Sequence, residues 1–233
     1  DLQALSEGTN TITANVSDAA GNAASQSSTT FTYDKTSPSI TSITPSWGSH
    51  LNATEDNSSG TITVVTSGVE DGQTVTVGLN GTNYTGSVSS NSVTVTISAT
   101  DLQALSEGTN TITADVSDIA GNAASQSSTT FVYDKTSPSI SSITLSWGTV
   151  LNATEDNNNG TVTVATSGVE DGQTVTLGLN SRTYTGSVSS NSVSITISAA
   201  KLQELVDGTT YTITADVSDV AGNEATQSST TFT

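Results

Sequence analysis

The sequence repeats with a period of 100 residues. The run Asp-Leu-Gln-Ala-Leu-Ser-Glu-Gly begins at Asp1 and again at Asp101, and a looser copy begins at Lys201. More than four fifths of the first 100 residues are identical to their counterparts one period later. Such a period is longer than the ~20–50 residues of a solenoid coil or propeller blade, and it is the size of an independent domain. The repeat therefore predicts a string of domains in tandem.

The segment Tyr33-Asp-Lys-Thr-Ser-Pro-Ser-Ile40 predicts where one domain ends and the next begins. It recurs from Tyr133, is polar, and its two copies carry two of the three prolines in the chain. Proline suits a linker or the first residue of a strand, because it cannot donate a hydrogen bond to a ladder. Residues 1–34 are then the C-terminal part of a truncated domain, 35–134 form a complete domain, and 135–233 form another.

Within a repeat the apolar residues alternate with polar ones. Val, Ile, Leu and Ala occupy every second position around residues 62–64, 75–79, 93–97 and 112–116, and the runs end in turn formers such as Glu-Asp-Gly and Ala-Gly-Asn. This alternation is typical of half-buried strands. With further strands near 40–43, 84–88 and 131–133, each repeat has about seven, and only residues 100–108 favour a short helical turn, before the penultimate strand. The pattern predicts an all-β protein of tandem immunoglobulin-like β-sandwiches.

The composition excludes several classes of function. Asp and Glu number 22 against 4 Lys plus Arg, which gives a formal net charge of −18. Phosphate binding needs clustered basic residues, so we expect neither nucleic acid nor an anionic membrane surface as a partner. No apolar run approaches the ~18 residues of a membrane span, so we expect no membrane insertion. Cysteine is absent and His50 is the single imidazole, so a thiol nucleophile is excluded and an enzyme is not expected.

Several motifs, in the same order, resemble the bacterial Ig-like repeat of giant surface adhesins secreted by the type I (RTX, biofilm-type) route. They are Leu51-Asn-Ala-Thr-Glu, Val69-Glu-Asp-Gly-Gln-Thr-Val-Thr, Tyr84-Thr-Gly-Ser-Val, Asp101-Leu-Gln-Ala-Leu-Ser-Glu-Gly, Val116-Ser-Asp-Ile-Ala-Gly-Asn and Tyr133-Asp-Lys-Thr-Ser-Pro. The resemblance covers the whole chain. It implies an extracellular stalk on the bacterial cell surface, with Ca²⁺ at the junctions between domains and neighbouring repeats as the partners. Trp47 and Trp147 are outside this pattern, and we assign them to packing.

Acidic residues gather in the loops that an Ig-like sandwich places at its two ends. Carboxylates converging from separate loops repel one another unless a cation lies among them, and Ca²⁺ accepts 6–8 oxygen ligands in adaptable geometry. At the second junction we expect Asn52, Glu55, Asp56 and Glu107 to face Asp134, Glu170, Asp171, Asp219 and Asn223. At the first junction the corresponding candidate metal ligands are Asp34, Glu70, Asp71, Asp118 and Asn122.

A simpler interpretation of these acids stays open, since Asp-Gly and Gly-Asn pairs are ordinary turn residues. Neighbouring acids such as Glu170 and Asp171 also point to opposite sides of the chain. For the function, the sequence favours a structural extender that projects a distal binding domain. The alternative is a module that binds carbohydrate or protein directly, against which the near-identity of the repeats and the scarcity of aromatic residues count.

Residues 1–34 supply only two strands and the short helical turn. Ile12, Ala14, Val16, Phe31 and Tyr33 then lack the strands that cover their counterparts, and an isolated two-stranded unit is marginal in water. We therefore expect strand complementation of residues 1–34 by another molecule or by residues outside this chain.

Overall fold

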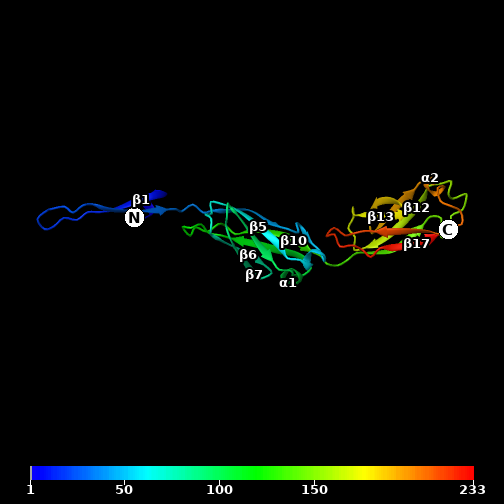
Figure 1. Ribbon diagram of the computed structural model, residues 1–233, viewed down its shortest axis with the longest axis horizontal. Coiled ribbons are helices and arrows are strands. Elements are labelled where there is room, and N and C mark those ends of the chain that lie inside the picture. The colour runs from blue at the N-terminus through cyan, green and yellow to red at the C-terminus, as the bar shows by residue number, and fades with distance from the viewer. Residues whose placement is uncertain (1) are drawn as a thin grey trace. The chain divides into compact units, whose positions relative to one another are not determined.

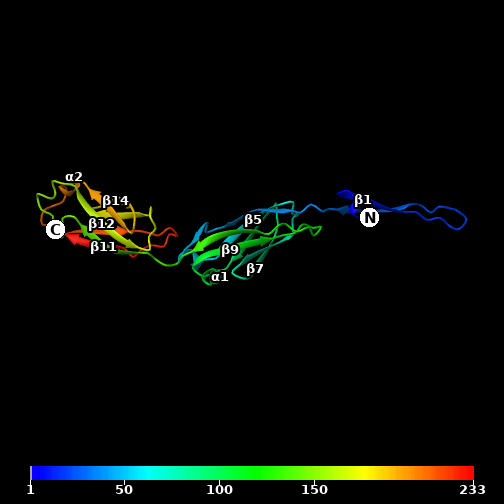
Figure 2. The same cartoon turned by 180° about the vertical axis from the view of Figure 1, so that it is seen from behind.

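The computed structural model describes residues 2–233 and is almost entirely β-structure (Figures 1 and 2). The contacts between Cα atoms divide the chain into two compact units. The first contains the residues up to Ser46, Ser59–Ser98 and Asn110–Thr130. The second contains Trp47–Ser58, Ala99–Thr109 and Phe131–Thr233. The domain boundaries at 34/35 and 134/135 remain sequence-based predictions.

The N-terminal segment is a β-hairpin. A short 3-10 helix η1 (Leu2–Ala4) is followed by β1 (Gly8–Ala14) and β2 (Ser27–Tyr33), which pair antiparallel from Gly8 opposite Tyr33 to Ala14 opposite Ser27. The two strands form a sheet by themselves. Consequently Ile12 and Val16 are 56% and 68% exposed, whereas their counterparts one repeat later, Ile112 and Val116, are buried.

The repeat from 35 to 134 forms two sheets. The three-stranded sheet has the order β3-β5-β8, and the five-stranded sheet has the order β4-β10-β9-β6-β7. The strands are β3 (Ser39–Pro45), β4 (His50–Leu51), β5 (Gly60–Ser67), β6 (Thr74–Leu79), β7 (Thr82–Ser87), β8 (Ser92–Ile97), β9 (Gly108–Asp115) and β10 (Ser127–Tyr133).

The repeat from 135 to 233 forms the same two layers, with a three-stranded sheet of order β11-β12-β15 and a four-stranded sheet of order β14-β13-β16-β17. The strands are β11 (Ser139–Leu145), β12 (Gly160–Ser167), β13 (Thr174–Leu179), β14 (Arg182–Ser187), β15 (Ser192–Ile197), β16 (Tyr211–Asp216) and β17 (Ser228–Phe232). Helix α2 lies at the same end of this sandwich as the C-terminus (Figures 1 and 2).

Helical structure is confined to single turns. Helices α1 (Ala99–Gln103) and α2 (Ala199–Leu202) precede the penultimate strand of each sandwich, as the sequence predicts, and the 3-10 helix η2 (Glu55–Asn57) was not expected. No helix described in residues 2–233 is long and apolar enough to cross a membrane.

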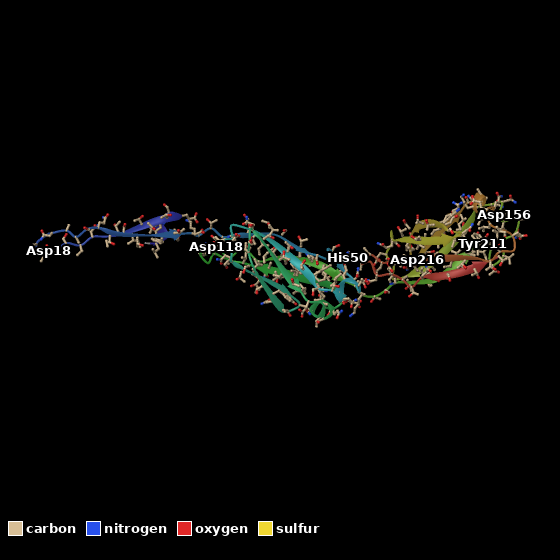
Figure 3. All side chains as sticks on the ribbon, in the orientation of Figure 1. Asp18, His50, Asp118, Asp156, Tyr211 and Asp216 are labelled. Carbon is tan, nitrogen blue, oxygen red and sulfur yellow. The ribbon has the colours of Figure 1, made fainter. Side chains whose placement is uncertain are left out.

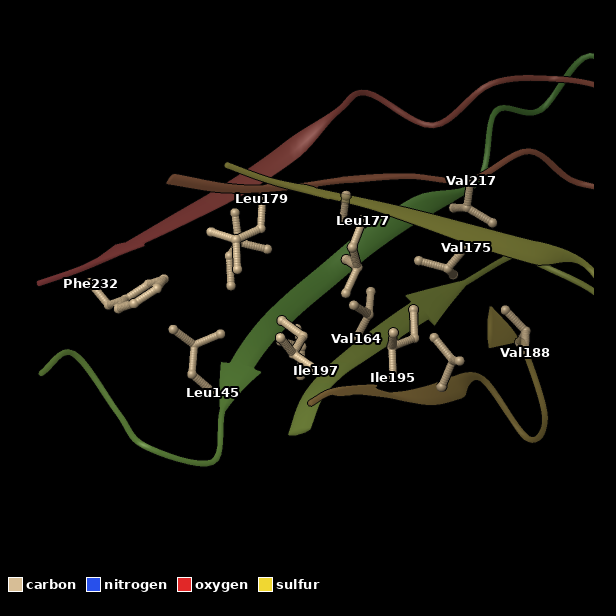
Figure 4. Packing of buried hydrophobic residues seen from close by; sticks show 14 of the residues in the cluster. Leu145, Val164, Val175, Leu177, Leu179, Val188, Ile195, Ile197, Val217 and Phe232 are labelled. Carbon is tan, nitrogen blue, oxygen red and sulfur yellow. The ribbon is translucent and has the colours of Figure 1, made fainter. Parts of the chain in front are cut away.

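The core of the C-terminal sandwich lies between its two sheets. Inward side chains from β11, β12 and β15 point toward those from β13, β16 and β17 (Figure 4). Val164, Leu177 and Ile213 have no exposed surface, and burying each such side chain contributes about 1.5–3 kcal/mol. Trp147 packs edge-on against Phe232, with ring centroids 5.4 Å apart, and Trp47 does the same with Phe131 at 5.2 Å.

The alternating burial along the central strands of the two sandwiches confirms the all-β, Ig-like fold class. In β12 and in β15 every second position is buried, and the positions between them are half-buried or exposed. The 35–134 repeat has one strand more than the seven expected, because the two-residue β4 pairs in parallel with the end of β10. Both tryptophans serve the packing role that the sequence assigned to them.

Candidate functional site

The loop from Asp118 to Asn122 folds around a buried carboxylate. Asp118 is 3% exposed, and the main-chain N–H of Asn122 donates to its Oδ1 at 2.8 Å. The Asn122 side-chain amide donates to Oδ2, also at 2.8 Å. Gly121 makes the return possible, because its φ of 92° lies in the left-handed region that glycine adopts without strain. The motif therefore specifies a closed loop with Asn122 at its end.

The loop from Asp219 to Asn223 has the same structure. Asp219 is buried and accepts hydrogen bonds from the main chain and side chain of Asn223 at 2.8 and 2.9 Å. Neither Asp118 nor Asp219 has a basic partner, since the ion pairs found in residues 2–233 join only Arg182 and Lys201 to Glu204. Burial raises the pKa of the Asp118 carboxyl, but the hydrogen bonds from Asn122 outweigh it and hold that pKa below its usual value. Asp118 therefore stays ionised at neutral pH.

Each of these loops binds the main chain of a linker. Within the first unit, the Asn122 amide donates to the carbonyl oxygen of Asp34 at 3.2 Å. Within the second unit, the Asn223 amide donates to the carbonyl oxygen of Asp134 at 2.9 Å. The Asp134 carboxylate itself accepts from the main-chain N–H of Thr136 at 2.9 Å. Both linkers are thus held by the same two residue types.

A glutamate holds the next part of each linker. Oε1 of Glu107 accepts the main-chain N–H of Lys135 at 3.0 Å and the Thr136 hydroxyl at 2.9 Å. The Lys135 N–H, then the Thr136 hydroxyl, lower the pKa of Glu107. Glu7 accepts the equivalent bonds from residues 35 and 36. The sequence singled out Glu107 but not Glu7, although the repeat itself contains that signal.

Asn52 also reaches this region of the second unit. Its side-chain amide donates to the carbonyl oxygen of Ala221 at 2.9 Å, and the main-chain N–H of Ala53 donates to Oδ1 of Asn223 at 3.0 Å. Glu55 accepts the main-chain N–H of Asn52 at 3.1 Å, so it fixes the same turn. The structure therefore brings Asn52, Asn223 and the Asp134 carbonyl into one hydrogen-bonded group.

The other residues that the sequence predicts as metal ligands form hydrogen bonds in other parts of the protein. Asp56 is buried, and the Tyr133 phenol donates to its Oδ2 at 2.6 Å. This carboxylate is therefore a hydrogen-bond acceptor inside the sandwich. Glu70 accepts the N–H of Ile119 at 3.0 Å, whereas Asp71 accepts that of Ser90 at 2.7 Å.

The next repeat shows the same division between its two adjacent acids. Glu170 bonds to Val220 at 2.9 Å and Asp171 to Ser190 at 2.7 Å. In each repeat one acid of the pair therefore faces the loop that contains the buried aspartate, and the other faces a different turn, as the sequence predicts.

The acidic side chains of the described residues do not form a complete metal site. No three acidic or imidazole side chains in the described chain lie close enough together to hold an ion. The type of donor nevertheless fits a hard cation, because Asp134, Asp219 and Asn223 offer carboxylate, amide and carbonyl oxygens. The buried carboxylate of Asp219, which has no basic neighbour among the described residues, and the main-chain carbonyl oxygen of Asp134 both accept hydrogen bonds from Asn223. Ca²⁺ is thus compatible with the donors present.

Comparisons with known proteins identify the sequence family and the fold. The family described as bacterial Ig-like domain (group 3) matches residues 1–96 and again residues 91–233. No curated protein sequence matches the chain.

Two solved structures share the fold, and a third shows a weaker similarity. One, described as structural insight into host cell surface retention of a 1.5-MDa bacterial ice-binding adhesin, covers 100% of this chain and 75% of its own, with 24% identity and a TM-score of 0.51. The fibronectin(III)-like modules of Clostridium thermocellum CbhA cover 84% and 92%, with 16% identity and a TM-score of 0.50. A Ca²⁺-stabilized adhesin that helps an Antarctic bacterium reach out and bind ice covers 97% of this chain, with 24% identity and a TM-score of 0.48. This chain spans only 56% of that structure's length.

Proposed function

Since this chain belongs to the bacterial Ig-like domain family (group 3), we propose that it is a structural extender segment of a bacterial surface adhesin. Its role is to hold a distal binding domain away from the cell, on the outside of the bacterium. It is not an enzyme in this proposal, and its partners are the neighbouring repeats of the same adhesin. The structures named above as adhesins support this role by their shared fold.

The observation that carries the proposal is the repeated attachment of the linkers. Asn122 and Asn223, each fixed by a buried aspartate, bind the carbonyl oxygens of Asp34 and Asp134. A protein whose task is reach needs a defined linker at every repeat, whereas a dedicated binding site is needed only once. The same attachment at both linkers is what an extender requires.

We further propose that Ca²⁺ binds at the junctions and restricts the motion of the linkers. At the second junction, Asp134, Asp219 and Asn223 would hold the ion, with Glu170 nearby, since it accepts the N–H of Val220 in the loop that contains Asp219. A bound cation would supply positive charge that offsets the repulsion between these carboxylates. Hydrogen bonds from the protein already hold the linker in place. Bound Ca²⁺ would hold it further by coordinating its oxygen atoms.

A calorimetric calcium titration tests the proposed ion. We expect wild-type protein to bind Ca²⁺ with a Kd of about 10⁻⁴–10⁻³ M, typical of extracellular modules. Asp134→Asn should weaken or abolish the heat of one class of sites. Asp216→Asn is the matched control, because it also removes one charge and, among the described residues, the Asp216 carboxylate bonds only to the Gln227 side chain. Equal binding by both variants and wild type would exclude Asp134 as a ligand.

The exposed hairpin supports a second part of the proposal, that residues 1–34 are completed by strands from another polypeptide segment. Ile12 and Val16 carry large exposed apolar surfaces that are buried at the equivalent positions of the next repeat. Such a segment would cover the hairpin in the way that the sheet of β3, β5 and β8 covers β9 and β10 in the complete repeat.

A further inference from the structure

The last residues of β10 are bound, one after another, to a single earlier segment of the chain. The two-residue strand β4 runs parallel with the end of β10, and His50, labelled in Figure 3, lies opposite Val132. Val132 donates its N–H to the carbonyl oxygen of Ser49 at 2.9 Å, and Asp134 donates its N–H to that of Leu51 at 3.0 Å. Two main-chain hydrogen bonds therefore join the two segments directly.

Side chains join the same two segments on either side of these bonds. The ring of Trp47, just before β4, packs edge-on against Phe131, with the ring centroids 5.2 Å apart. The Tyr133 phenol donates to the carboxylate of Asp56 at 2.6 Å, and both residues are buried. Together with the main-chain bonds, these contacts bind each of four consecutive residues to the segment 47–56.

The parallel direction of the two segments decides how they respond to tension. The chain enters the first segment at residue 47 and leaves the second at residue 134, and in a parallel pair these points are at opposite ends. Tension along the chain therefore pulls the segments past each other and loads all the bonds between them together. In the antiparallel pair β6–β7, where Thr74 lies opposite Ser87, the outer ends are neighbours, so the same pull would break one bond at a time.

The linker that follows β10 is attached as well. Glu107 accepts the main-chain N–H of Lys135 at 3.0 Å and the hydroxyl of Thr136 at 2.9 Å. The Lys135 ammonium group also lies over the ring of Tyr133, 5.7 Å from its centroid. Tension that arrives through the linker therefore acts first on residues that are themselves bound to the protein, before it reaches β10.

We propose that the segments 47–56 and 131–134, which we call the β4–β10 clamp, bear tensile load and resist unfolding of the repeat 35–134 when the chain is pulled. The biological use of this resistance rests on the proposed extender role, because a stalk transmits every pull on the domain that it carries. The clamp consists of main-chain hydrogen bonds, one phenol–carboxylate pair and two packed rings. None of these contacts needs a metal ion, so the resistance persists in chelating buffer.

Single-molecule force measurements on the full chain test the proposal. The chain contains no cysteine, so two introduced cysteines are the only attachment points. One pair, Ser46→Cys with Ser137→Cys, pulls on opposite ends of the clamp; the other, Thr54→Cys with Ser137→Cys, pulls on neighbouring ends, and all three positions are exposed. At the same constant force, the first pair should give lifetimes longer by about tenfold or more, the effect of one further hydrogen bond that must break at the same time.

Three variants make the result specific to the clamp. Val132→Pro removes the N–H that bonds to Ser49, and Tyr133→Phe, a milder change, removes only the bond to Asp56. Each should shorten the lifetime with the first attachment pair by about tenfold. Val64→Ala is the control, because Val64 is fully buried in β5 but makes none of the clamp's bonds. It should lower the midpoint of urea unfolding and leave the lifetime under force nearly unchanged.

Equal lifetimes with the two attachment pairs would overturn the proposal. So would a loss of lifetime in Val64→Ala as large as that in Tyr133→Phe, since resistance would then follow overall stability and not the clamp. The lifetimes are measured without calcium, whereas the extender role concerns the calcium dependence of the linkers without applied force. A failure of the clamp is therefore distinguishable from a failure of the proposed function.

Discussion

At the residue scale, the pair of Tyr133 and Asp56 shows how two polar groups are accommodated inside a small apolar core. Tyr133 has no exposed surface and Asp56 is 5% exposed. Each satisfies the other through the 2.6 Å hydrogen bond, so neither is left without a partner away from water. Two residues 77 positions apart in the sequence become interdependent.

Replacing Tyr133 with Phe should destabilise the 35–134 repeat by about 1–3 kcal/mol, because a buried carboxylate then loses its donor while the ring still fills its space. Urea denaturation followed by tryptophan fluorescence measures the change. Tyr211→Phe is the matched control in the other repeat, since its hydroxyl bonds to a loop N–H near the surface. A loss no larger than that of the control would contradict the role of the pair.

The same pair predicts alkaline sensitivity. Burial, and then the hydrogen bond to Asp56 and its charge, raise the pKa of Tyr133 well above its usual value near 10. A raised pKa means that the folded state holds the proton more tightly, so this stabilisation is complete below about pH 10 and is lost as the pH rises further. The unfolding midpoint should fall between about pH 10 and 12. In Tyr133→Phe this fall should be shallower; an identical slope would disprove the assignment.

At the scale of secondary-structure elements, one sequence in two contexts separates local preference from packing. Strands β1 and β2 have nearly the same sequence as β9 and β10, and both pairs form. In β9 and β10, however, Ile112 and Phe131 are buried, whereas Ile12 is 56% exposed in β1. Alternation thus predicted the strands, and tertiary contact decides their stability.

Hydrogen exchange should therefore be much faster in β1 and β2 than in β9 and β10. A two-stranded sheet without a covered face opens with little cost, while the strands inside a sandwich exchange only on larger unfolding. NMR with residue-specific assignment distinguishes the copies, for example at Asn15 and Asp115, and the ratio of protection factors is the measurement. Equal protection would mean that the hairpin is covered in solution.

The features that sequence reasoning missed depend on distant partners. The two-residue strand β4 exists because His50 and Leu51 meet Val132 and Tyr133, and no local pattern announces a pairing of that length. Similarly, nothing near Asp56 indicates that it faces Tyr133 rather than a junction. By contrast, the Asp-x-Ala-Gly-Asn loops were found because the left-handed glycine and the capping asparagine are local requirements.

At the scale of the whole molecule, the excess of acidic residues and the hydrogen-bonded linkers both bear on the proposed calcium site. The net charge of −18 makes the chain repel itself, and only 4 basic residues are available to offset it. The linker at Asp134 is already bound by Asn223, while the carboxylates around it have no basic partner in the described residues. The proposed Ca²⁺ would supply the missing counter-charge, and in that proposal the loss of the ion loosens the linkers while each sandwich keeps its own core.

Small-angle X-ray scattering in CaCl₂ and in NaCl of matched ionic strength tests this account most directly. We expect wild-type protein to have a larger mean end-to-end distance and a narrower distance distribution in CaCl₂. Chelation, or Asp134→Ala in CaCl₂, should reduce the mean distance and broaden the distribution. Simple screening of charge would act equally in both salts. Identical scattering in matched CaCl₂ and NaCl would contradict the calcium-ordered extender and leave a chain of acidic sandwiches joined by hydrogen-bonded linkers.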